Sequence, residues 1–262
     1  MKVLIMVLLV TSLFVATNSF EVIGVYDLPS KCFVEGYIYR DGMIVESCGP
    51  NGKSRVQTYT LDSNSKSASL PHVRYVNDYE VFAEGLAYLD GLYYQLTYTT
   101  GEVYVYDDHF HLLETLELPE EMENSGWGLT TDGEFLYANN GENILFKIQP
   151  STFEVVDQIP VIYSDGSKAD NINECEVAKG VMFCNVFMSN NILKINYQTG
   201  EVLEIYNMTP LATLATTVSK NNRRFHNFNP KSNVLNGIAY NENKGSFYVT
   251  GKDWPAVFEV LF

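Results

Sequence analysis

The chain has 262 residues, and its 32 acidic and 17 basic side chains give a formal net charge of −15 at pH 7. This excess of acid excludes nucleic acid as an expected partner, because binding phosphates requires a basic face. At 46% hydrophobic and 19% charged residues the chain can bury a full core, and its 18 Tyr and 15 Phe favour a β-rich fold.

The N-terminal segment has the pattern of a secretory signal peptide. One lysine precedes an apolar run from Val3 to about Val15, and small and polar residues follow. The run is shorter than the roughly 20 residues that a bilayer span needs, so a signal anchor is the weaker alternative. We predict a signal peptide over residues 1–19. The secreted mature chain, 20–262, is expected to form one domain without a membrane segment.

Two further features of the sequence are typical of secreted proteins. The number of cysteines is even, which in an oxidising compartment indicates disulfides. Cys175 and Cys184 lie at matching distances on either side of a predicted tight turn, so we pair them. Cys32 and Cys48 bracket a second turn less symmetrically and form the other predicted pair. Asn207 begins an N-glycosylation sequon, although a proline follows that sequon.

Five segments of the chain repeat one pattern of short strands and turns. They begin at Glu35, Glu84, Trp127, Asn173 and Asn236, at intervals of 49, 43, 46 and 63 residues. Hydrophobic residues alternate with period two, and no segment shows a convincing helical stripe. Small antiparallel sheets that recur about every 40–50 residues are typical of propeller blades. We therefore predict an all-β fold, a five-bladed β-propeller.

A β-sandwich is the alternative architecture, since strands of equal length can also form two packed sheets. Recurrence of the turns in register favours the propeller. The strand-like segment 21–29 precedes the first repeat, and we expect it to complete the last blade and close the ring. The longest interval contains an extra polar stretch, 219–231, which we interpret as an inserted loop.

Propeller geometry would bring the opening residues of the repeats together. The innermost strand of each blade lines the central channel, so equivalent positions meet at one mouth. Carboxylates and amides gathered there are costly to desolvate unless they serve a ligand. This convergence predicts a functional site at the channel mouth.

The motifs around these positions resemble those of a known enzyme family. FVEG at 33–36 and FAEG at 82–85 open the first two repeats. Further motifs follow in order at residues 46–54, 95–98, 126–133, 173–176, 185–187, 235–240 and 249–255. Over residues 30–262 the chain resembles the plant and bacterial type of glutaminyl cyclase, also called glutamine cyclotransferase, whose fold is a five-bladed propeller.

Three positions depart from the family pattern. Glu35 stands where the family has Gln, and Tyr98 and Phe187 stand where it usually has Trp. The aromatic exchanges keep a stacking wall. A second carboxylate near Glu84 would raise the pKa of one of the two groups by like-charge repulsion. We also expect negative potential at the mouth to attract substrates that carry an ammonium group.

The resemblance implies an acyltransferase that converts the N-terminal glutamine of peptides or proteins to pyroglutamate and releases ammonia. Glu84 matches the family's acid and is the expected general acid/base, which takes a proton from the α-amine and gives it to the leaving nitrogen. Lys252 and Asn173 are the expected donors to the oxyanion, with Asn236 as a lesser candidate.

Aromatic side chains are expected to enclose the substrate's aliphatic part. The predicted substrate-binding residues are Phe33, Glu35, Phe82, Tyr98, Trp127, Phe187, Asn236 and Trp254. For Trp254 an alternative role is to seal its blade.

We expect a monomer. We also expect that it needs no metal or cofactor, because none of the four histidines stands at a channel-opening position. A calcium-dependent propeller hydrolase of the lactonase type is one alternative, since converging Glu and Asn residues also suit a hard cation. Lys252 argues against it, because a divalent ion would repel that lysine. A non-catalytic binding module is the second alternative.

Overall fold

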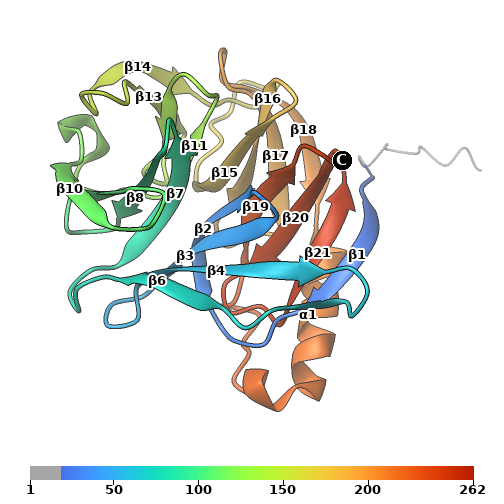
Figure 1. Ribbon diagram of the computed structural model, residues 1–262. Helices are drawn as coiled ribbons and strands as arrows, with labels where there is room; N and C mark the ends of the chain where they lie inside the picture. Colours follow the sequence, from blue (N-terminus) through green and yellow to red (C-terminus); the bar gives the residue numbers. More distant parts are fainter. Residues whose placement is uncertain (1–18) are drawn as a thin grey trace, which may run out of the picture.

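The computed structural model describes residues 19–262, so residues 1–18 of the predicted signal peptide lie outside the described residues. Within 19–262 the fold is all-β, as predicted (Figure 1). Antiparallel sheets make up the body of the molecule, and α1 (Thr209–Asn221) lies outside them (Figure 1). Short 3₁₀ turns, η1 (Glu120–Met122) and η2 (Arg223–Phe225), interrupt two connections.

The middle of the chain forms consecutive antiparallel meanders in which each strand pairs with the next along the sequence. The first consists of β7 (Ala83–Leu89), β8 (Leu92–Thr97), β9 (Glu102–Tyr106) and β10 (Leu112–Glu117). The second consists of β11 (Leu129–Thr131), β12 (Leu136–Ala138), β13 (Ile144–Ile148) and β14 (Val155–Pro160). The third consists of β15 (Ile172–Ala178), β16 (Val181–Val186), β17 (Asn191–Asn196) and β18 (Glu201–Asn207).

The two ends of the described chain meet in one sheet. Its strands are β19 (Leu235–Asn241), β20 (Ser246–Gly251), β21 (Ala256–Leu261) and β1 (Glu21–Asp27). β1 lies antiparallel beside β21, with Val25 opposite Phe258 (Figure 1). The prediction that the N-terminal strand completes the last sheet is therefore confirmed.

The remaining strands belong to the sheet that opens the repeats: β2 (Phe33–Arg40), β3 (Met43–Gly49), β4 (Arg55–Asp62) and β6 (His72–Val76). The two-residue strand β5 (Ser67–Ala68) pairs with both β4 and β1. It thereby connects this sheet with the one that holds the chain ends.

The first strands of the successive sheets contact one another around a closed ring: β2 contacts β7, β7 contacts β11, β11 contacts β15, β15 contacts β19, and β19 contacts β2. Two glycines permit the close approach. A Cβ on Gly85 would lie 2.5 Å from the amide nitrogen of Leu129, and one on Gly36 would lie 2.5 Å from that of Leu86. Apolar side chains fill the space between neighbouring sheets, such as Leu96 and Phe146 between the first two meanders.

The expectation that no segment is helical is wrong for 209–221. Pro210 stands in the first turn of α1, where its missing N–H and fixed φ are tolerated. Leu211, Ala215 and Ser219 are buried at a spacing of four. This stripe consists mostly of small residues, which is why hydropathy did not reveal it. Residues 219–221 of the predicted inserted loop are thus helical.

Both predicted disulfides are present, Cys32–Cys48 and Cys175–Cys184. The second pair joins directly opposed residues of β15 and β16, with their Cα atoms 4.1 Å apart. Within residues 19–262, no helix is both long and apolar enough to cross a membrane. Asn207 is exposed at the end of β18, and its glycosylation stays a prediction.

The packing of the inner strands predicts that Gly85→Ala is strongly destabilising. The new methyl group would collide with backbone atoms of the neighbouring strand, which cannot move independently, so we expect a loss of about 3 kcal/mol of unfolding free energy. Urea unfolding measures this loss. Gly91→Ala is the matched control, because its φ of +86° is strained for alanine but nothing lies within 4 Å. Its expected cost is only about 1 kcal/mol. Equal losses in the two variants would contradict this account of the ring.

Candidate active site

A cavity of about 490 Å³ opens where the inner strands begin. Its lining contains nine of the eleven residues that the sequence predicts for catalysis or substrate binding: Phe33, Glu35, Phe82, Glu84, Tyr98, Trp127, Asn173, Phe187 and Lys252. The predicted convergence at one mouth therefore exists as geometry. The two other predicted residues, Asn236 and Trp254, do not line the cavity.

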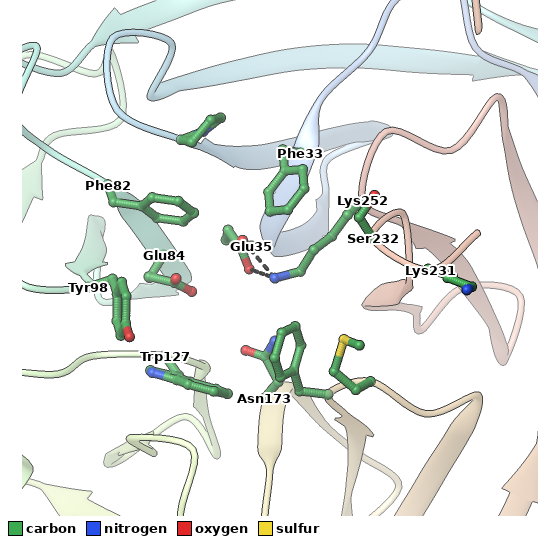
Figure 2. A pocket seen from close by; sticks show the side chains of 13 residues that line it. Phe33, Glu35, Phe82, Glu84, Tyr98, Trp127, Asn173, Lys231, Ser232 and Lys252 are labelled. Atoms are coloured by element: carbon green, nitrogen blue, oxygen red, sulfur yellow. Dashed lines mark hydrogen bonds and ion pairs between the residues drawn. The ribbon is translucent and has the colours of Figure 1, made fainter. Parts of the chain in front are cut away.

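Glu84 lies on β7 and directs its carboxyl group toward the centre of the cavity (Figure 2). The side chain is buried, and Oε2 has no hydrogen-bond partner among the described residues. Burial, followed by the negative charge of Glu35, raises the pKa of Glu84 well above its usual value. A buried carboxyl group with a free oxygen and a raised pKa can exchange a proton with a ligand.

Glu35 and Lys252 form a buried ion pair beside Glu84 (Figure 2). The lysine Nζ lies 2.7 Å from Oε1 and 2.6 Å from Oε2 of the carboxylate. Burial raises the pKa of Glu35, while the Lys252 charge opposes that rise. The expected like-charge effect therefore falls on Glu84. The sequence analysis did not anticipate that Lys252 pairs with Glu35, which offsets one of the two carboxylate charges expected at the mouth.

Asn173 on β15 provides an amide group on the opposite side of the cavity (Figure 2). Its Oδ1 is buried and has no hydrogen-bond partner among the described residues. Its backbone carbonyl accepts a hydrogen bond of 2.8 Å from Nδ2 of Asn139, which holds the strand in place. The backbone of Asn173 is thus held in place while its side-chain Oδ1 has no partner among the described residues, which suits a group that binds a ligand.

Aromatic rings surround these polar groups in an unbroken arc. Neighbouring rings meet edge to face, at centroid distances of 6.4 Å for Phe33–Phe82, 5.9 Å for Phe82–Tyr98, 6.2 Å for Tyr98–Trp127 and 5.5 Å for Trp127–Phe187. The Lys252 Nζ lies 4.9 Å from the ring centroid of Phe33 and 5.0 Å from that of Phe187, which closes the arc. This wall keeps the carboxyl groups in a poorly hydrated environment.

Two predicted substrate-binding residues have structural positions instead. Trp254 is buried against Phe258, and its Nε1 donates to the backbone carbonyl of Asn233 at 2.9 Å, so it packs into the core of its sheet. Asn236 donates through Nδ2 to the carbonyl of Val34 at 2.8 Å and to Oε2 of Glu35 at 3.2 Å. It orients Glu35 from behind and does not face the cavity.

Four lining residues were missed by the sequence analysis: Pro50, Met188, Lys231 and Ser232. They lie in connections outside the repeated strands, where the repeat pattern gives no register. Met188 directly follows the motif at 185–187, and Lys231 ends the stretch recognised as an insertion. Pro50 lies within the motif at 46–54, so three of the four missed residues had a signal in or beside a recognised segment.

The described residues, 19–262, offer little support for the calcium alternative. One group of three ligand-type side chains lies within 4.8 Å there, Cys32, Glu46 and Cys48. Both of its thiols are joined in a disulfide, so they are not available as thiolate ligands. At the mouth, the positive charge beside Glu35 is supplied by Lys252.

Comparisons with known proteins agree in pointing to one family. Residues 9–262 match the family model described as glutamine cyclotransferase. A glutaminyl-peptide cyclotransferase from Arabidopsis thaliana is 30% identical over 244 residues, which cover 93% of this chain and 71% of that protein.

Solved structures give a consistent result. The glutaminyl cyclase of Myxococcus xanthus superposes with a TM-score of 0.75 at 28% identity, covering 92% of this chain and 95% of that one. A luciferin-regenerating enzyme superposes with a TM-score of 0.51 at 14% identity, over 91% and 95% of the two chains. At that identity the second likeness shows the fold alone.

The buried ion pair predicts a pH-dependent loss of stability in Lys252→Met. Without the lysine, burial raises the pKa of Glu35 further, and the folded protein holds a proton that the unfolded chain releases. Stability therefore falls as the pH rises above the usual carboxyl pKa, and we expect a loss of about 3–5 kcal/mol near pH 8 but a much smaller loss near pH 5. Chemical unfolding at both pH values measures the difference.

Lys194→Met is the matched control for this prediction. Lys194 pairs with Glu204 at 3.0 Å, but both side chains are partly exposed, at 26% and 34%. Breaking such a pair costs less than about 1 kcal/mol. Adding Glu35→Gln to Lys252→Met should restore most of the stability lost near pH 8. A loss that does not depend on pH, or that the second substitution leaves unchanged, would show that the pair is not the cause.

Proposed function

The chain belongs to the glutamine cyclotransferase family, and we propose that it cyclises the N-terminal glutamine of peptides or proteins to pyroglutamate, with Glu84 as general acid/base. The observation that carries this proposal is the Glu84 carboxyl group, whose Oε2 has no hydrogen-bond partner among the described residues, in a cavity walled by aromatic rings. The reaction is an acyl transfer from the γ-carboxamide nitrogen to the α-amine, so the protein is a transferase.

The reaction requires the site to remove a proton from the attacking amine, to protonate the departing nitrogen and to stabilise the oxyanion. The α-amine forms a bond with the γ-carbonyl carbon of its own residue, the bond from that carbon to the amide nitrogen breaks, and ammonia leaves. Because the nucleophile and the carbonyl belong to one residue, little entropy of approach is lost, and orientation and proton transfer become decisive. Ionised Glu84 takes the proton from the attacking amine and returns it to the departing nitrogen.

Asn173 and Lys252 support the proposed role of oxyanion donors. The Lys252 ammonium has three N–H groups, of which one donates to Oε1 of Glu35, while Oε2 lies 2.6 Å from Nζ. An N–H group of Lys252 would remain for the oxygen of the tetrahedral intermediate, together with the side-chain N–H groups of Asn173. Glu35 would thus hold Lys252 in position, which is a positioning role. The aromatic arc would enclose the methylene groups of glutamine and exclude water.

The closed ring of inner strands supports a five-bladed propeller, our proposal for the architecture of residues 20–262. The meanders at 83–207 supply three blades, and the sheets containing β2 and β19 supply the others, with β5 as a bridge between them. We also propose that residues 1–19 are a signal peptide and that the protein is secreted. The two disulfides are consistent with an oxidising compartment.

Glu84→Gln tests the proposed acid/base. The amide keeps the shape of the carboxyl group but cannot accept the proton, so we expect kcat to fall about 10²- to 10⁴-fold. Ammonia release from a Gln-initiated peptide, with mass spectrometry of the cyclised product, measures the rate. Glu114→Gln, on the exposed surface of β10, is the control and should retain full activity. Full activity in Glu84→Gln would refute the assigned role, and an inactive wild-type protein would refute the function.

Glu35→Gln tests how the neighbouring charge tunes Glu84. The wild-type kcat/KM should fall at acidic pH as Glu84 becomes protonated, with a midpoint above the usual carboxyl value of 4.5 because its pKa is raised. Removing the Glu35 charge lowers the pKa of Glu84, so the acidic limb should move to lower pH. A pH–rate profile of both proteins measures the shift.

Glu46→Gln controls for other buried acids. Burial raises the pKa of Glu46 to about 7, but this side chain lies outside the cavity. Its replacement should leave the acidic limb of the pH profile in place. If the acidic limb moves in Glu46→Gln and stays fixed in Glu35→Gln, the titrating group is coupled to Glu46, and the proposed tuning of Glu84 by Glu35 is wrong.

A further inference from the structure

A second cavity, of about 310 Å³, adjoins the candidate active site. The two cavities share the residues Met188 and Lys231. Ser189 and Asn190 line one side of the second cavity, and Pro230 and Val234 line the other. Lys231 lies on the side of the active site away from Glu84, beyond Lys252 (Figure 2). The second cavity thus continues the path that leads outward from the proposed site of reaction.

Met188 separates the two cavities in a constrained turn. Its φ is +61°, in the left-handed region that a side chain larger than that of glycine rarely adopts. The turn is closed by a hydrogen bond of 3.1 Å from the Ser189 amide to the carbonyl of Val186. The Met188 side chain nevertheless remains 63% exposed. An exposed apolar side chain held in a strained turn between two cavities is suited to contact a bound chain.

Lys231 is held by a rigid turn. The Asn229 Oδ1 accepts a hydrogen bond of 3.1 Å from the Lys231 amide, and the Asn233 Oδ1 accepts one of 2.7 Å from the Asn229 amide. The carbonyl of Asn233 accepts the Trp254 Nε1 hydrogen bond, so this turn is fixed to the core. The side chain of Lys231 is exposed, and among the described residues no ion pair involves its ammonium group.

The charges inside the active site do not compete with this cation. Glu35 is paired with Lys252, and Glu84 lies on the opposite side of the active site from Lys231 (Figure 2). The positive charge of Lys231 is therefore the charge that the second cavity presents to a bound chain. This is opposite in sign to the preference that the net charge of the protein suggested.

We propose that the second cavity binds the residues that follow the N-terminal glutamine of the substrate, and that Lys231 makes it select acidic side chains there. The inference rests on the proposed cyclase function. It names the substrate class as peptides whose first residues after glutamine include Asp or Glu. Lys231 is a specificity residue here and takes no part in bond making.

Three peptides that differ only after glutamine test this subsite: Gln-Asp-Asp, Gln-Ala-Ala and Gln-Lys-Lys at the head of one neutral sequence. The wild-type protein should show kcat/KM values about 2- to 5-fold higher for the acidic than for the neutral peptide, the range of one exposed ion pair. The basic peptide should rank last. The difference should lie in KM, with kcat unchanged, and should shrink as salt is raised to about 0.5 M.

Lys231→Glu should reverse this ranking, so that the basic peptide has the highest kcat/KM and the acidic peptide the lowest. Lys220→Glu is the matched control, because it makes the same charge change at an exposed site of the same inserted segment but outside both cavities. It should keep the wild-type ranking.

The outcomes separate the two proposals. If the neutral peptide is not cyclised by the wild-type protein, the cyclase function itself fails. If it is cyclised but the three peptides react equally, or the basic peptide is preferred, the subsite is refuted. The same holds if Lys231→Glu and Lys220→Glu change the ranking alike, because the effect then comes from net charge and not from Lys231.

Discussion

The ring of inner strands leaves backbone groups at its centre that neighbouring strands do not all satisfy, and polar side chains complete their hydrogen bonding. Glu174 Oε2 accepts from the Ile238 amide at 2.7 Å, and Glu176 Oε1 accepts from the Tyr240 amide at 2.9 Å. Asn185 accepts from the Gly237 amide at 2.9 Å. These three bridges join the sheet of β15 and β16 to the neighbouring sheet that begins with β19. The centre of the ring is therefore polar for a structural reason, and the mouth is where such groups become available to a ligand.

This constraint explains why a raised pKa alone does not identify the catalytic acid. Burial and the charge of Glu176 raise the pKa of Glu174 well above its usual value, and burial raises that of Glu176 to about 8. Both carboxyl groups already accept backbone hydrogen bonds, so a substrate would have to break those bonds to reach them. Glu84 has a similarly raised pKa but a free Oε2 facing the cavity. The free oxygen distinguishes it.

The repeat pattern predicts most of the residues that line the cavity, although Asn236 opens the fifth repeat and does not line it. Glu84 and Asn173 occupy equivalent positions of the second and fourth repeats, so period-two alternation and spacing were enough to bring them to one mouth. Features outside the repeat escaped prediction. Trp254 lies in the motif at 249–255, but its Nε1 donates to the backbone carbonyl of Asn233, which stands outside the recognised motifs. Helix α1 buries small side chains, and the cavity wall at Lys231 depends on a turn that only the fold places beside Lys252.

The state of the buried charges bears directly on how a cyclase can work near neutral pH. A peptide α-amine has an ordinary pKa of about 7.7–8, so it arrives mostly as ammonium, which cannot attack a carbonyl. A carboxyl group of ordinary pKa would take that proton poorly, because transfer would run uphill by several pKa units. Burial and the Glu35 charge raise the pKa of Glu84 toward that of the amine. The raised pKa reduces this difference, so one carboxyl group can first accept the proton of the amine and then donate it to the departing amide nitrogen. Lys252 keeps Glu35 ionised through their ion pair, while its own positive charge opposes the rise in the pKa of Glu84. The pKa of the proposed acid/base therefore depends on both members of the ion pair.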